Sequence, residues 1–209
     1  MIFKDRREAG RVLAKMLKEY CCKDNYLVVA LPRGGVEVGY EIAKELKLPL
    51  EIFFTKKIPS PYNEEVAVGA VSEDKEIAID PYAANLLKLD NSYYQKWALK
   101  KLQEIEEKRR KYKKALPSFK DKGVILTDDG VATGASIILA AKAIKNLGAK
   151  EIIIAVPVAP TQIYEKLKEV ANRVVVAHLD SNLVAVGRFY QDFHQLSDEE
   201  VISYLKEFE

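Results

Sequence analysis

Two adjacent carboxylates, Asp128 and Asp129, end an apolar run in the segment VILTDDGVATGAS, residues 124–136. Carboxylates repel a phosphate group, so a pair placed beside a phosphate-binding turn must hold something else. The vicinal hydroxyls of a ribose meet this requirement, because carboxylates accept their protons. The same negative charge would stabilise a cationic sugar in a transition state. The acid pair therefore predicts a ribose site.

Small residues after the acid pair predict a phosphate cradle. Gly130 and Gly134 let the backbone turn tightly and approach a ligand closely. Thr133 and Ser136 add hydroxyl donors, and a following helix would present free N–H groups and the positive end of its dipole. The segment thus suits a ribose 5-phosphate. The alternative is a solvated strand-to-helix turn in which an Asp caps the helix.

A second turn, LPRGG, has similar properties. Arg33, Gly34 and Gly35 directly follow an apolar run and precede a helical pattern, which combines free N–H groups with a cation. A pyrophosphate would fit there. A plain strand-to-helix turn is the alternative, and the glycine spacing does not match G-x-G-x-x-G.

Strands and helices alternate around both turns. Such alternation predicts a mostly parallel sheet flanked by helices, so the acid pair would lie at the carboxyl end of a strand, where open α/β sheets bind ligands. The predicted strands cover 26–31, 50–54, 124–127, 152–156 and 174–177, and the predicted helices cover 5–20, 36–46, 135–147, 161–170 and a tail after Ser197.

The middle of the chain departs from this alternation. We expect an irregular segment over 55–65, then a β-hairpin around the turn SEDK, and a long charged helix over 92–116 that starts with a capping box of Ser92 and Gln95. The basic end of that helix invites a nucleic-acid hypothesis. Pairs of the type Glu104 to Lys108 along the helix explain the charges more simply.

The composition limits the function classes. The chain has 209 residues with 33 Lys and Arg against 31 Asp and Glu, so a net charge of +2 predicts no broad attraction to nucleic acid or membranes. No apolar run approaches a membrane span or a signal peptide, and we expect a cytoplasmic protein. Cys21 and Cys22 are adjacent, which makes a strained disulfide and a poor metal site, so we expect two core thiols.

The segment 124–136 resembles the phosphoribosyl pyrophosphate (PRPP) signature of the type I phosphoribosyltransferases: an apolar strand, an acidic pair and a T-G loop. The stretches FKDRREAG, LPRGGV and VGRFYQDFHQLSDEEV are similar to an uncharacterised branch of these enzymes. The resemblance implies a type I phosphoribosyltransferase fold over 1–209 as a single domain. It also implies a β-ribbon flexible loop, a helical insertion at about 82–116 and a small C-terminal hood, mainly 178–209.

The resemblance further implies transfer of the 5-phosphoribosyl group of PRPP to a nitrogen acceptor, in particular a nucleobase, with Mg2+ and release of pyrophosphate. Asp128 and Asp129 would hold the ribose and the metal, either directly or through the ribose hydroxyls and water. Lys56, or its neighbour Lys57, would neutralise the leaving pyrophosphate. The implied substrate-binding residues are Arg33, Gly34, Gly35, Gly130, Val131, Ala132, Thr133, Gly134, Ala135, Ser136 and Tyr190.

The acceptor stays open at this point. One hood aromatic residue, Tyr190 above all, could stack on a planar ring, but we find no counterpart of the lysine that reads the purine carbonyl in purine-salvage relatives. A homodimer is expected, since dimers are common in the family. Two alternatives remain: a regulatory protein that binds PRPP or a nucleotide without turnover, and a phosphohydrolase or phosphoacceptor domain with an Asp nucleophile. The phosphohydrolase alternative does not explain why the sequence has both the TGAS loop and the LPRGG turn.

Overall fold

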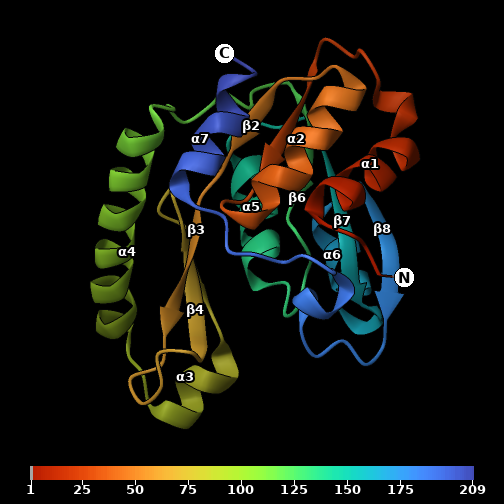
Figure 1. Cartoon of the computed structure of the whole chain (residues 1–209). Helices are drawn as coiled ribbons and strands as arrows, with labels where there is room; N and C mark the ends of the chain where they lie inside the picture. Colours follow the sequence, from red (N-terminus) through yellow and green to blue (C-terminus); the bar gives the residue numbers. More distant parts are fainter. Residues whose placement is uncertain (1) are drawn as a thin grey trace.

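A five-stranded parallel sheet forms the centre of the computed structural model, which describes residues 2–209 (Figure 1). The strand order is β2-β1-β6-β7-β8, and every neighbouring pair is parallel. The sequence-based prediction of a parallel sheet is therefore confirmed. The strands are β1 (Tyr26–Ala30), β2 (Leu50–Ile52), β6 (Gly123–Thr127), β7 (Glu151–Pro160) and β8 (Arg173–Asp180).

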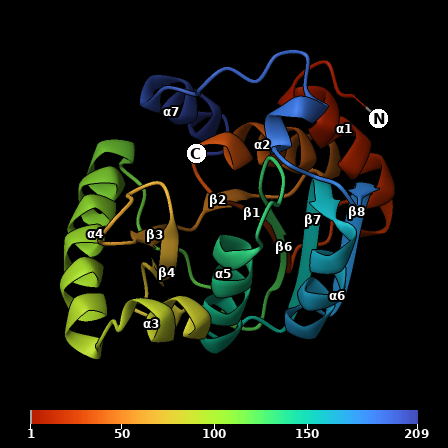
Figure 2. The same cartoon turned by 90° about the horizontal axis from the view of Figure 1, so that it is seen from below.

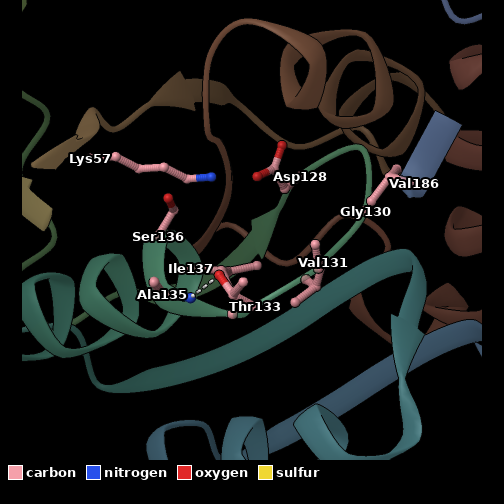
Figure 3. A pocket seen from close by; sticks show the side chains of 11 residues that line it. Lys57, Asp128, Gly130, Val131, Thr133, Ala135, Ser136, Ile137 and Val186 are labelled. Atoms are coloured by element: carbon pink, nitrogen blue, oxygen red, sulfur yellow. Dashed lines mark hydrogen bonds between the residues drawn. The ribbon is translucent and has the colours of Figure 1, made fainter. Parts of the chain in front are cut away.

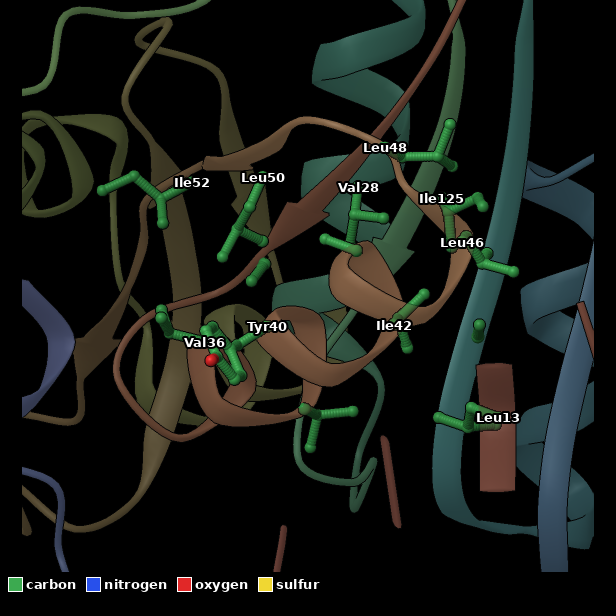
Figure 4. Close-up of a cluster of buried hydrophobic side chains, with 14 of the residues drawn as sticks. Leu13, Val28, Val36, Tyr40, Ile42, Leu46, Leu48, Leu50, Ile52 and Ile125 are labelled. Atoms are coloured by element: carbon green, nitrogen blue, oxygen red, sulfur yellow. The ribbon is translucent and has the colours of Figure 1, made fainter. Parts of the chain in front are cut away.

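Helices cover both faces of this sheet (Figure 2). Helices α1 (Arg6–Met16) and α2 (Gly34–Leu46) lie on one face, and α5 (Ala135–Asn146) and α6 (Thr161–Val170) on the other. Neighbouring strand residues point to opposite faces. Val28 accordingly packs with the α1 and α2 side chains, whereas Val29 packs with those of α5 and α6. Figure 4 shows the first of these two buried clusters.

A smaller antiparallel sheet lies beside the first and consists of β3 (Thr55–Pro59), β4 (Ala67–Ser72) and β5 (Ile77–Ile79). The predicted hairpin is present as β4 and β5. The prediction of an irregular segment from residue 55 was wrong over β3, because these residues pair with β4 and add a third strand to the ribbon. The sequence did not reveal this strand, because its pairing with β4 is nonlocal and because Pro59 and Pro61 are typical of irregular segments.

The helical insertion packs on this ribbon. It comprises α3 (Pro81–Leu87) and α4 (Asn91–Tyr112). The predicted capping box was wrong, because the α4 cap is Asp90, whose carboxylate accepts the N–H of Tyr93 at 3.0 Å. Tyr94 is buried against the ribbon and Trp97 packs beside it, so these aromatic side chains help to hold α4 in place.

The C-terminal segment contains the 3-10 helix η2 (Val186–Phe189) and helix α7 (Asp198–Lys206). The predicted cap of α7 is confirmed, since Ser197 and Glu200 form a capping box. The N-terminal strand-like segment is tied to this region: the N–H of Phe3 donates to the carbonyl of Phe189 at 2.7 Å. Both chain ends thus take part in the C-terminal hood.

Two smaller expectations concern the surface. Cys21 and Cys22 are exposed, so the prediction of core thiols was wrong; they follow the short 3-10 helix η1 (Lys18–Tyr20), where the chain turns toward β1. No helix within residues 2–209 has the length and apolar character needed to cross a membrane.

Candidate active site

The turn between β6 and α5 surrounds a cavity of about 190 Å³ (Figure 3). The run from Gly130 to Ile137 lines it, together with Asp128, Lys57 and Val186. The structure therefore brings together every residue predicted for the phosphate cradle. Helix α5 begins at Ala135 and has no side-chain cap, so its first N–H groups remain available to a ligand.

Gly134 makes this turn possible. It is the N-cap of α5 and has φ +81°, in the left-handed region that residues with a Cβ atom rarely adopt. A Cβ atom there would also lie 2.9 Å from Cγ2 of Ile163. The glycine thus lets the loop return tightly to the helix and keeps the cradle open.

The two aspartates have different environments. Asp128 faces the cavity and lies opposite the ammonium group of Lys57 (Figure 3). Asp129 instead forms an ion pair with Arg6 at 2.9 Å. Burial and the adjacent Asp129 raise the pKa of Asp128 well above its usual value, and Lys57 opposes the shift. Burial also raises the pKa of Asp129, although Arg6 acts in the other direction. The site consequently favours a cation or hydroxyl donors next to this pair.

Arg6 is a site residue that the sequence analysis missed. Its Nε donates to Asp129, one terminal nitrogen donates to the carbonyl oxygen of His194 at 2.8 Å, and the guanidinium lies 3.9 Å from the ring centroid of Phe193. The side chain is only 5% exposed. Arg6 lies three residues before Ala9, so both residues are on the same, buried face of α1. A cation on the apolar face of a predicted helix was the signal in the sequence that could have identified Arg6.

The LPRGG turn lies against the acid pair. It follows β1, whose neighbour in the sheet is β6, and a Cβ atom on Gly34 would be 1.9 Å from Oδ2 of Asp129. One on Gly35 would be 2.9 Å from Cα of Asp128. Only glycine permits this approach. The two predicted loops therefore meet at the carboxyl ends of adjacent strands.

Lys56 and Lys57 point to opposite sides of β3, as neighbouring strand residues do. The side chain of Lys57 enters the phosphate cavity. Lys56 instead lies in a second hollow with Arg33 and approaches Glu104 at 3.7 Å. That Lys56 or Lys57 meets the leaving pyrophosphate stays a prediction: the structure places Lys57 in the cradle cavity and Lys56 beside Arg33 of the LPRGG turn.

Tyr190 lies behind the acid pair. It is 6% exposed, its hydroxyl donates to the carbonyl oxygen of Asp129 at 2.6 Å, and its ring packs against those of Phe3 and Phe193. The expectation that Tyr190 stacks on a planar ligand does not match this placement, because the side chain is buried and Phe193 already stacks on its ring. Val186 is the hood residue that reaches the cavity.

The acid pair can serve Mg2+ only together with other ligands. Among residues 2–209, no group of three or more His, Cys, Asp or Glu residues forms a candidate metal centre. Asp128 and Asp129 nevertheless supply hard carboxylate oxygens, and one of them is already engaged by Arg6. Mg2+ commonly binds one or two carboxylates and takes its remaining ligands from phosphates and water. The residues present fit a magnesium ion of that kind.

A parallel sheet flanked by helices, with two glycine turns meeting at an acid pair, defines the type I phosphoribosyltransferase fold. Residues 3–192 match the family model of the phosphoribosyl transferase domain, and the chain belongs to this family. The fold and the family anticipated from the sequence are therefore both confirmed.

Several known proteins are similar to the chain. It is 32% identical over 206 residues to two Mycobacterium tuberculosis proteins, called "Putative phosphoribosyl transferase Rv0571c" (strain H37Rv) and "Putative phosphoribosyl transferase MT0597" (strain CDC 1551). The match covers 98% of this chain and 46% of each relative, so the chain spans about half their length.

Two solved structures extend the comparison. TT1426 from Thermus thermophilus is 38% identical, with a TM-score of 0.80 over 100% of this chain and 99% of that one. A purine phosphoribosyltransferase from Pyrococcus horikoshii is 18% identical, with a TM-score of 0.50 over 92% of both chains. The second likeness concerns the fold alone.

Proposed function

We propose that the protein transfers the 5-phosphoribosyl group of PRPP to a nitrogen acceptor and releases pyrophosphate, with Mg2+ as cofactor. The observation that carries this proposal is the proximity of three features: the cradle at the start of α5, the acid pair beside it, and the LPRGG turn that lies against this pair. PRPP has three corresponding parts: its 5-phosphate matches the cradle, its ribose matches the acid pair, and its diphosphate matches the LPRGG turn.

Each feature has a role in this reaction. The backbone over 131–136 and the hydroxyls of Thr133 and Ser136 bind the 5-phosphate. The carboxylates of Asp128 and Asp129 accept hydrogen bonds from the ribose hydroxyls and stabilise positive charge as the bond from C1 to the pyrophosphate oxygen breaks. When bound, Mg2+ would be held by the acid pair with the substrate and would offset charge on the leaving group.

Binding and orientation account for most of the expected catalysis. The acceptor nitrogen forms the new bond to C1 and loses its proton, so no protein side chain has to act as a nucleophile. Lys57 supplies positive charge beside the cradle, and Arg33 with Lys56 receives the departing pyrophosphate. Exclusion of water by the hood would favour transfer over hydrolysis.

A nucleobase is the proposed acceptor. The hood contributes the apolar side chain of Val186 to the cavity, which Val131 also lines, and apolar side chains suit the flat face of a ring. An acceptor without a charged recognition group fits this wall best. An apolar wall has no polar group that would select one particular base. It is therefore also compatible with the regulatory alternative, in which PRPP is bound without turnover.

Calorimetric titration with PRPP and Mg2+ tests the proposal. The double variant Asp128→Asn, Asp129→Asn is expected to bind about 100-fold more weakly, because two charge-assisted contacts are lost. Asp24→Asn is the matched control, since Asp24 is exposed and precedes β1, at the amino ends of the strands and away from the candidate active site. Pyrophosphate release is then screened with purine and pyrimidine bases. Failure of the wild type to bind PRPP would overturn the proposal, and binding without release would favour the regulatory alternative.

A further inference from the structure

A second hollow of about 250 Å³ adjoins the LPRGG turn, whose glycines lie against the acid pair. Three separate elements contribute cations to it: Arg33 from the turn, Lys56 from β3 and Lys108 from α4. No carboxylate lines this hollow in the part of the chain that the structure describes. It is therefore a positively charged recess next to the candidate active site.

The charges in the recess are only partly compensated. Within residues 2–209, no carboxylate oxygen lies within 4.0 Å of the Arg33 guanidinium. Lys56 has Glu104 as its ion-pair partner, at 3.7 Å, which is too long for a hydrogen bond. Arg33 thus has no carboxylate partner within this distance and Lys56 has only a long ion pair, so both can bind a further anion.

Lys108 forms an ion pair with Asp198, and Asp198 has two further hydrogen-bond donors. Its ammonium group donates to both oxygens of Asp198 at 2.8 and 2.7 Å, and the same carboxylate accepts from Lys111 at 2.7 Å and from the hydroxyl of Tyr112 at 2.7 Å. Burial opposes ionisation of Asp198, but these donors outweigh it and hold its pKa below the usual value. If Lys108 turned toward another anion, Asp198 would keep two donors.

These ion pairs also explain the basic end of α4. The expected pairing of Glu104 with Lys108 along the helix is replaced by contacts with Asp198, the first residue of α7. Helix α4 is thereby fixed beside the hood, with one of its lysines at the recess. The insertion contributes to the site rather than lying apart from it.

We propose that Lys108 is a pyrophosphate-binding residue and that the helical insertion supplies it to complete, with Arg33 and Lys56, a site for the leaving group. This inference rests on the proposed function, because it assigns the recess to the diphosphate part of PRPP. Three cations suit a diphosphate, which carries several negative charges in a short span. Lys108 already lines the recess, and Asp198 retains Lys111 and Tyr112 as donors when Lys108 binds the diphosphate.

Titration with inorganic pyrophosphate tests Lys108 without any transfer reaction. Lys108→Met is expected to weaken binding about tenfold, because one charge-assisted contact is removed. Lys111→Met is the matched control: Lys111 shares Asp198 but does not line the recess. Lys108→Arg should restore most of the affinity. Thermal unfolding of the variants compares their folding.

The outcomes separate this inference from the proposed function. Equal affinities of wild type and Lys108→Met would overturn the inference, and so would an equal loss in Lys111→Met, since the effect would then come from docking of α4. Absence of pyrophosphate binding in a wild type that turns over PRPP would also overturn it. Lys108-dependent binding by a protein that releases no pyrophosphate from PRPP would support the recess and count against the proposed function.

Discussion

Arg6 and Asp129 form a 2.9 Å ion pair across 123 residues of sequence, and this pair connects α1 to the acid pair of the candidate active site. The same guanidinium donates to the carbonyl oxygen of His194 in the hood. One side chain therefore fixes the orientation of a carboxylate and the position of the segment that covers it.

Replacement of Arg6 by Met should both destabilise the fold and weaken PRPP binding. Asp129 would keep a largely buried charge without its partner, and we expect a loss of about 3 kcal/mol in the free energy of unfolding, measured by urea denaturation. Arg7→Met is the control, because its partner Glu41 would retain Arg11 at 3.4 Å. Similar losses in both variants would contradict a special role for the Arg6 contact.

Replacement of Asp128 by Asn should stabilise the protein at neutral pH while it weakens PRPP binding. The pKa of Asp128 is raised in the folded state by burial and by Asp129, so the folded state binds this proton more tightly than the unfolded state. The stability from this group is present below the unfolded value near 3.8 and is lost as pH rises through the higher folded value.

Urea denaturation between pH 4 and pH 8 gives the measurement for Asp128→Asn. The variant should lose less stability than the wild type as pH rises over this interval. A variant less stable than wild type at pH 7 would show that the carboxylate contributes favourable contacts that outweigh its burial.

His194 predicts a second pH effect of the same sign. Hydrogen bonds to Glu200 at 2.9 Å and Asp192 at 3.2 Å raise its pKa above the ordinary value of 6.5. This contribution is complete below pH 6.5 and is lost as pH rises through the raised folded value. In Glu200→Gln, the loss measured by denaturation from pH 5 to pH 9 should begin at lower pH. An unchanged pH dependence of stability in Glu200→Gln would contradict the assignment of this effect to the hydrogen bond between His194 and Glu200.

The strand, turn and helix over 123–146 follow closely from the sequence because local signals agree there. The apolar run forms a buried parallel strand, and glycine and small hydroxyl residues define the turn. Arg6 and Tyr190 could not be placed in this way. Their contacts with Asp129 depend on how α1 and the hood pack around the finished sheet, which local periodicity does not encode.

The choice between Lys56 and Lys57 shows the same limit. A strand alternates its side chains, but the sequence does not show which face meets the cavity until the register of β3 with β4 is known. The prolines on either side weakened the strand signal further. Nonlocal pairing therefore determines which lysine approaches the phosphate cradle.

Gly34→Ala should weaken binding of PRPP strongly without unfolding the protein. The added Cβ atom would lie 1.9 Å from Oδ2 of Asp129, so the turn and the carboxylate must move apart. We expect about 100-fold weaker PRPP binding by calorimetry, since small displacements of positioning groups have large effects. The thermal unfolding midpoint provides the check on folding. Retained affinity would contradict the close contact of the two loops.

Lys57→Met and Lys56→Met should affect different ligands. Lys57 faces the cradle, so its replacement should weaken binding of ribose 5-phosphate about tenfold and leave inorganic pyrophosphate binding nearly unchanged. Lys56 lines the recess with Arg33, so its replacement should have the opposite pattern. Calorimetry with both ligands on both variants makes each the control for the other. If both variants weakened the same ligand equally, the two hollows would be one continuous anion site, and the division imposed by the alternating side chains of β3 would be wrong.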